Sequence, residues 1–83
     1  MIDILVVEDN DELRDVLERF LLHEGYQTRC VNRGNDALAL LQQEKVRLLL
    51  VDIMLPDMDG YEVLQAVQEY DETLPVIFIT AQD

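Results

Sequence analysis

The chain alternates between short apolar runs and longer segments with helical periodicity, and this alternation restricts its fold more than any other feature. Runs rich in β-branched and aliphatic residues predict four strands: Ile2–Val7, Tyr26–Val31, Arg47–Asp52 and Val76–Thr80. The first, third and fourth runs lack polar alternation, which is typical of strands covered on both faces. The second run alternates polar and apolar residues, which favours a position at the edge of a sheet.

The segments between these runs have the spacing of amphipathic helices. The first follows an N-cap at Asn10 or Asp11 and ends at Gly25, a residue that suits a helix C-terminus. Its apolar residues recur at i, i+3, i+4, i+7 and i+8, so that one face is formed by Leu13, Val16, Leu17, Phe20 and Leu21. A second short helix ends near Glu44, and a third runs from about Asp59 to Tyr70.

The resulting order, βαβαβαβ, predicts an α/β fold. Parallel strands need crossover connections, and right-handed helical crossovers place helices on both faces of one sheet. With the polar strand at an edge, the sheet order becomes 2-1-3-4, the doubly wound, flavodoxin-like arrangement. Ligands of such sheets bind beyond the carboxyl ends of the strands, here between the first and third strands.

Composition limits the possible classes of function. The 83 residues suffice for one small domain, and a hydrophobic content of 49% argues against a disordered acidic segment. The net charge of −12 argues against nucleic-acid binding through these residues. No apolar run reaches the ~18 residues of a membrane helix, and no signal peptide is evident, so we expect no membrane contact. The single cysteine, Cys30, suits a reducing cytoplasm.

Three acids are predicted to meet at the switch point of the sheet. Glu8 and Asp9 follow the first strand, Asp52 ends the third, and Thr80 ends the fourth. At ~5 Å and an effective dielectric constant near 20, each pair of carboxylates repels by ~3 kcal/mol. A divalent cation would remove this cost, and all-oxygen ligands suit Mg²⁺ or Mn²⁺. Asp52 could then act as a nucleophile toward phosphorus, although each acid alone could also be a simple helix cap or first-turn acid.

The motifs "VVEDN", "LLLVDIMLPDMDGYEVL" and "VIFITA" together resemble the receiver domain of bacterial two-component response regulators, from Ile2 to Ala81. The resemblance implies that Asp52 accepts a phosphoryl group from a phosphohistidine. It also implies that Glu8, Asp9, Asp52 and the backbone carbonyl of Met54 hold Mg²⁺. Thr80 would be the switch hydroxyl that bonds the phosphoryl oxygen.

The chain departs from that family at its end. A complete receiver continues through a fourth helix, a fifth strand that begins with a phosphoryl-contacting lysine, and a fifth helix. The only lysine, Lys45, is expected at the opposite edge of the sheet, roughly 16–20 Å from Asp52. We therefore expect residues 1–83 to form a single truncated receiver domain without the last strand and helices. Its exposed fourth strand, Val76–Thr80, predicts self-association, or incomplete folding when the chain is alone.

These observations favour a cytoplasmic phosphoacceptor module whose partner is a sensor histidine kinase or a phosphotransfer protein. Such a module modifies itself and turns over no separate substrate, so it is not a metabolic enzyme. The alternative is a truncated receiver-like folding or interaction fragment without productive phosphorylation. A different Mg²⁺-dependent aspartyl-phosphate enzyme is disfavoured because Met54, not a general acid, lies two residues after Asp52. Asp57 and Asp59 are interpreted as turn and N-cap residues, and Arg14 as part of a solvated helix face.

Overall fold

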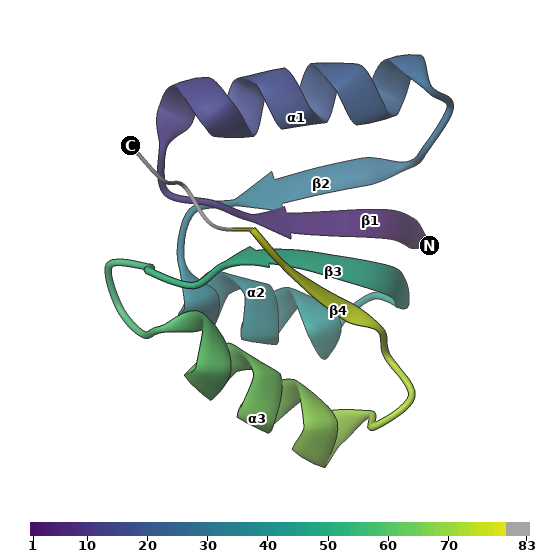
Figure 1. Cartoon of the computed structure of the whole chain (residues 1–83). Coiled ribbons are helices and arrows are strands. Elements are labelled where there is room, and N and C mark those ends of the chain that lie inside the picture. The colour runs from purple at the N-terminus through teal and green to yellow at the C-terminus, as the bar shows by residue number, and fades with distance from the viewer. Residues whose placement is uncertain (80–83) are drawn as a thin grey trace.

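The computed structural model describes residues 1–79, and their elements follow the predicted order (Figure 1). The elements are β1 (Ile2–Val7), α1 (Asp11–His23), β2 (Thr28–Val31), α2 (Gly34–Leu41), β3 (Val46–Asp52), α3 (Gly60–Tyr70) and β4 (Val76–Ile79). Thr80, the predicted last residue of the fourth strand, lies outside the described residues. Within residues 1–79, no helix has the length and apolar character needed to cross a membrane.

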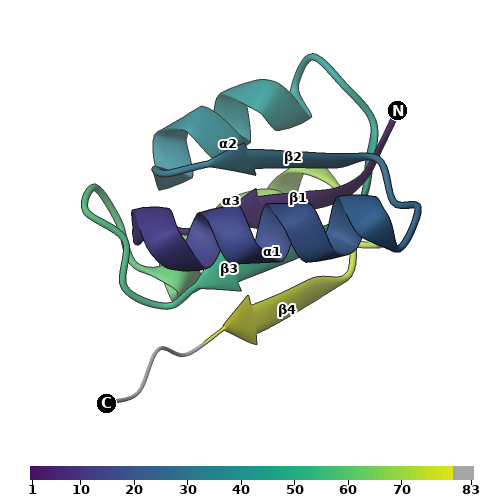
Figure 2. The same ribbon diagram turned by 90° about the horizontal axis from the view of Figure 1, so that it is seen from above.

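The strands form one parallel sheet in the order β2-β1-β3-β4, which confirms the predicted doubly wound arrangement. β1 is central, and its Ile4 pairs with Thr28 of β2 on one side and Leu48 of β3 on the other. The carboxyl ends of β1 and β3 therefore lie side by side, at the edge where the β1–α1 and β3–α3 connections emerge (Figures 1 and 2).

The two faces of the sheet are covered unequally. Helices α2 and α3 lie on one face and α1 on the other (Figure 1). The main core lies against α2 and α3, where Leu49, Val51, Val63 and Val67 are fully buried. By contrast, within residues 1–79 no residue of α1 is fully buried. The predicted apolar stripe on α1 has the expected spacing, but Val16 and Phe20 remain 61% and 60% exposed.

Two predicted boundaries were wrong by two or three residues. β2 begins at Thr28 and not at Tyr26, because the Tyr26 N–H still donates to Leu21 O at the end of α1. α2 ends at Leu41 and not near Glu44, because the N–H of Gln42 donates to Ala39 O in a tighter final turn. Gly25 has a φ of +96°, a backbone conformation that glycine adopts without strain, and this explains why a glycine ends α1 as predicted.

Candidate metal centre

Three of the predicted site residues lie together at the carboxyl edge of the sheet. Glu8 follows β1 directly, Asp9 is the next residue, and Asp52 is the last residue of β3. One carboxylate oxygen from each side chain lies within 4.8 Å of the others. The pairing of β1 with β3 produces this meeting, since it places both strand ends at the same height. Thr80, the fourth predicted residue, lies outside the described part of the chain.

Two of the three acids are nearly inaccessible to solvent. Glu8 is 1% exposed and Asp52 is 7% exposed, whereas Asp9 is exposed. Glu8 Oε2 accepts a hydrogen bond from the Asn10 N–H at 3.0 Å, but Oε1 has no hydrogen-bond partner among residues 1–79. Burial raises the pKa of Glu8 to about 7, the Asn10 N–H opposes this, and the neighbouring Asp52 adds to the rise.

The donor set fits a small divalent cation. A cation would supply the missing partner of Glu8 Oε1 and would neutralise the mutual repulsion of the three carboxylates. Oxygen ligands from two or three carboxylates, with the remaining positions open to water or substrate, suit Mg²⁺, and Mn²⁺ has similar preferences. The exposed Asp9 leaves one side of the cluster open to solvent.

The connection between β3 and α3 shapes the surroundings of Asp52. Asp52 Oδ1 accepts a hydrogen bond from the Met54 N–H at 3.2 Å, while the Met54 side chain is 78% exposed. The base of the connection is closed by a bridge between Met54 and Asp59 and by the Gly60 N–H, which donates to Ile53 O at 2.6 Å. These bonds hold the backbone next to Asp52 close to the sheet.

Two residues near the site have contacts that the sequence interpretation missed. The Arg14 guanidinium donates to Glu8 O at 3.0 Å and pairs with Asp11 at 2.6 Å, so Arg14 is not merely part of a solvated face. A signal existed, since Arg14 lies at the start of α1, within reach of the end of β1. Asp57 binds the N-terminus of α2, a long-range contact that no local pattern indicates. Asp59 is the N-cap of α3, as predicted.

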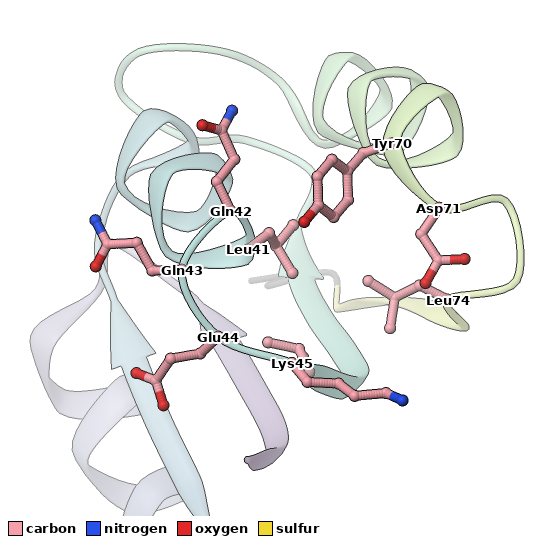
Figure 3. A pocket seen from close by; sticks show the side chains of 9 residues that line it. Leu41, Gln42, Gln43, Glu44, Lys45, Tyr70, Asp71 and Leu74 are labelled. Atoms are coloured by element: carbon pink, nitrogen blue, oxygen red, sulfur yellow. The ribbon is translucent and has the colours of Figure 1, made fainter.

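A cavity of about 310 Å³ lies at the end of the sheet opposite the acidic cluster, between the C-terminal ends of α2 and α3 (Figure 3). Leu41 and Tyr70 contribute apolar surface, and Lys45 and Asp71 lie at its margin. Lys45 directly precedes β3, and its carbonyl accepts the Ile2 N–H at 2.8 Å. The structure thus separates this lysine from the acidic cluster, as the sequence predicts.

Comparison with known proteins gives consistent results. A family model described as "Response regulator receiver domain" matches residues 4–83. The chain is similar to the non-phosphorylated HemR receiver domain from Leptospira biflexa, at 28% identity and a TM-score of 0.90, with 99% of this chain and 66% of that chain covered. It is also similar to the response regulator TrrA from Thermotoga maritima, solved in complex with Mg²⁺ and beryllium fluoride. That match has 30% identity and a TM-score of 0.91, and it covers 100% of this chain and 72% of that chain.

A CheY-like receiver domain protein from Methanospirillum hungatei matches at 30% identity and a TM-score of 0.92. This match covers 100% of the chain and 66% of its counterpart. The chain thus spans about two thirds of the length of these solved proteins.

Proposed function

Because the chain belongs to the response regulator receiver domain family, we propose that it is a phosphoacceptor module of two-component signalling. Asp52 is the phosphoacceptor, and the donor is a phosphohistidine on a sensor histidine kinase or a phosphotransfer protein. Its place of action is the cytoplasm, and its role is to signal rather than to turn over a separate substrate. Residues 1–83 belong to one receiver domain.

The single observation that carries this proposal is the acidic cluster, in which Glu8 and Asp52 are buried and Glu8 Oε1 has no hydrogen-bond partner among residues 1–79. A carboxylate at a buried strand end is costly without a compensating charge, and two further acids beside it increase that cost. Such an arrangement suits Asp52 as a phosphoacceptor that acts beside a bound cation. Glu8, Asp9, Asp52 and the backbone carbonyl of Met54 are the proposed Mg²⁺ ligands.

Two solved relatives support the proposal, one of them for Mg²⁺ and both for a bound phosphoryl group. TrrA was solved with Mg²⁺ and beryllium fluoride, and the response regulator MaeR was solved with beryllium trifluoride at 32% identity to this chain. Trifluoroberyllate has the tetrahedral shape and the negative charge of a phosphoryl group. When bound, Mg²⁺ would neutralise charge on the phosphoryl oxygens and draw them toward Asp52.

The chemistry of Asp52 then follows from its position. One carboxylate oxygen forms a bond to phosphorus as the phosphorus–nitrogen bond of the donor breaks, and the leaving imidazole keeps the bonding electrons. The Met54 N–H, bonded to Oδ1, limits rotation of the carboxylate and leaves Oδ2 as the attacking atom. Low exposure of Asp52 reduces competition by water. Thr80 is the proposed switch hydroxyl that bonds the transferred group.

Mass spectrometry of the intact chain tests the proposal. Incubation with Mg²⁺ and a small phosphodonor such as acetyl phosphate should add the mass of one phosphoryl group to the wild-type chain. Asp52→Asn should take up none, because an amide is not a nucleophile toward phosphorus. Asp36→Asn, in the first turn of α2, serves as a matched control and should still be labelled, since that residue lies outside the cluster. An unlabelled wild-type chain, or equal labelling of Asp52→Asn, would favour the alternative of an interaction fragment without productive phosphorylation.

We also propose that the chain self-associates through the outer side of β4. Among residues 1–79 this strand has a neighbour, β3, on one side only, and its Ile77 is 51% exposed. Apolar strand edges with free N–H and C=O groups favour pairing with another chain.

A further inference from the structure

Asp57 joins the loop after β3 to the N-terminus of α2. Its Oδ1 accepts the Gly34 N–H at 2.9 Å, and its Oδ2 accepts the Asn35 N–H at 2.8 Å. These are the first two residues of α2, whose N–H groups have no partner within the helix. Within residues 1–79 the local N-cap residue, Arg33, makes no side-chain capping bond, so Asp57 performs this role from 23 and 22 residues away.

An apolar contact reinforces the same junction. Gly34 is buried against Met58, the residue that follows Asp57. A Cβ atom at Gly34 would lie 2.5 Å from Met58 Cγ and 2.6 Å from Met58 Sδ. The loop tip and the helix end therefore meet through two carboxylate bonds and one close side-chain contact.

The other end of this loop is the acidic cluster. Met54 N–H bonds Asp52 Oδ1, and the bridge between Met54 and Asp59 closes the base of the loop. Residues 53–59 are thus fixed at the base by the sheet and at the tip by α2. A loop anchored at only one end samples more conformations, and the backbone beside Asp52 would share that freedom.

From this geometry we propose that Asp57 is a positioning residue for the metal centre. By capping α2 from the β3–α3 loop, it holds the backbone at Met54 in the arrangement that Mg²⁺ binding requires. This inference rests on the proposed function, because it assumes that Met54 contributes to a Mg²⁺ site. The favourable position of a carboxylate at a helix N-terminus also accounts for the lowered pKa of Asp57, whose largest cause is the Asn35 N–H.

Mg²⁺ titration of the chain, followed by calorimetry and by backbone amide NMR, tests the inference. Asp57→Ala should weaken Mg²⁺ affinity roughly 3- to 10-fold, less than the ~10- to 100-fold effect of groups that contact metal ligands directly, because Asp57 acts through the loop backbone. Asp57→Asn keeps one acceptor oxygen and should fall between Asp57→Ala and the wild-type chain. In the metal-free variants, the amide signals of residues 53–55 and 57–59 should broaden or shift together with those of Gly34 and Asn35.

Two controls separate positioning from charge and from stability. Asp36→Asn removes one negative charge from the first turn of α2, where Asp36 accepts no side-chain hydrogen bond in the described part of the chain, and should bind Mg²⁺ like the wild type. Asp71→Ala removes a turn cap at the opposite edge, where Asp71 binds the Thr73 N–H and hydroxyl. It should lower the melting temperature without changing Mg²⁺ affinity.

The outcomes are distinguishable. Wild-type Mg²⁺ affinity in Asp57→Ala, with the Gly34 and Asn35 signals shifted, would overturn the positioning role and leave the proposed function intact. An equal loss of affinity in Asp36→Asn would show that charge alone is responsible, and would also overturn it. A wild-type chain that binds no Mg²⁺ would refute the metal centre itself, and the positioning role with it. If Asp57→Ala fails to fold, the milder Asp57→Asn decides between these results.

Discussion

At the scale of one residue, the Glu8 carboxylate is costly to bury in its charged form. Its side chain is 1% exposed, one oxygen is bonded to the Asn10 N–H, and the other has no partner in residues 1–79. Burial raises its pKa from 4.5 to about 7, and the nearby Asp52 contributes in the same direction. Without a cation, the folded chain therefore binds a proton at Glu8 more tightly than the unfolded chain does.

This difference predicts a pH-dependent stability in the absence of metal. Below pH 4.5 Glu8 is protonated in both states, and the stabilisation is fully present. As the pH rises through about 7, the folded state must accept the buried charge, and the free energy of unfolding should fall by roughly 2–3 kcal/mol. Thermal melts in chelator should show a melting temperature several degrees higher at pH 5 than at pH 8.

Addition of Mg²⁺ at pH 8 should restore the melting temperature, because a ligand that binds only the folded state stabilises it. Glu8→Gln has no charge to bury and should lose most of the pH dependence. A melting temperature that does not change between pH 5 and pH 8, or an unchanged slope in Glu8→Gln, would contradict the role assigned to this residue.

The junction of β3 and α3 is the element on which the geometry of the site depends most directly. α3 begins at Gly60 with a capping box, in which the Glu62 N–H donates to Asp59 at 2.8 Å. Gly60 lies so close to β3 that an added Cβ would lie 2.9 Å from Asp52 O and 2.9 Å from Ile53 Cα. Both neighbours are backbone atoms, one in the last residue of β3 and one in the residue after it, and they cannot move aside as a flexible side chain could.

Gly60→Ala should therefore destabilise the chain by about 1–3 kcal/mol, the usual range for overpacking. Because the displaced backbone adjoins Asp52, the variant should also be labelled more slowly by a small phosphodonor. Denaturant melts and time-resolved mass spectrometry measure the two effects. Gln65→Ala, at an exposed position of the same helix, is the matched control and should be nearly neutral. Wild-type stability in Gly60→Ala would contradict this prediction, because it would show that the backbone at the end of β3 moves easily to accommodate a Cβ atom.

The molecule as a whole leaves apolar surface on the α1 side of the sheet. Leu48 and Leu50 of β3 are only partly buried, and Ile77 of β4 is 51% exposed. The net charge of −12 opposes association between copies, since like charges repel over about a Debye length. Self-association should therefore depend on the salt concentration, because salt screens the repulsion between copies of the chain.

Light scattering at micromolar concentration should show association that increases with sodium chloride. Ile77→Lys should weaken it, because a lysine on an edge strand disfavours pairing with another chain. Leu22→Lys introduces the same charge at a residue of α1 that is also 51% exposed, and it should have a smaller effect. A monodisperse monomer at high salt, or equal effects of the two substitutions, would refute association through β4.

Local sequence patterns were sufficient for much of this structure. Unbroken apolar runs identified β1, β3 and β4, since this pattern is typical of strands covered on both faces, although Ile77 of β4 is 51% exposed. The alternation in Tyr26–Val31 placed β2 at an edge correctly, although its start was predicted two residues early. The acids of the site could be named because they end or follow strands whose carboxyl ends meet in any sheet of this order.

The sequence by itself therefore determined the order of the elements, the doubly wound topology and the meeting of Glu8, Asp9 and Asp52. Only the tertiary structure decided that Glu8 Oε1 has no partner among residues 1–79, that Asp57 caps α2, and that Val16 and Phe20 of the α1 stripe stay exposed. The physical reason is the range of the interactions involved. Periodicity and capping act within a few residues, whereas burial and the contact between Asp57 and Gly34 depend on which distant segments the fold brings together.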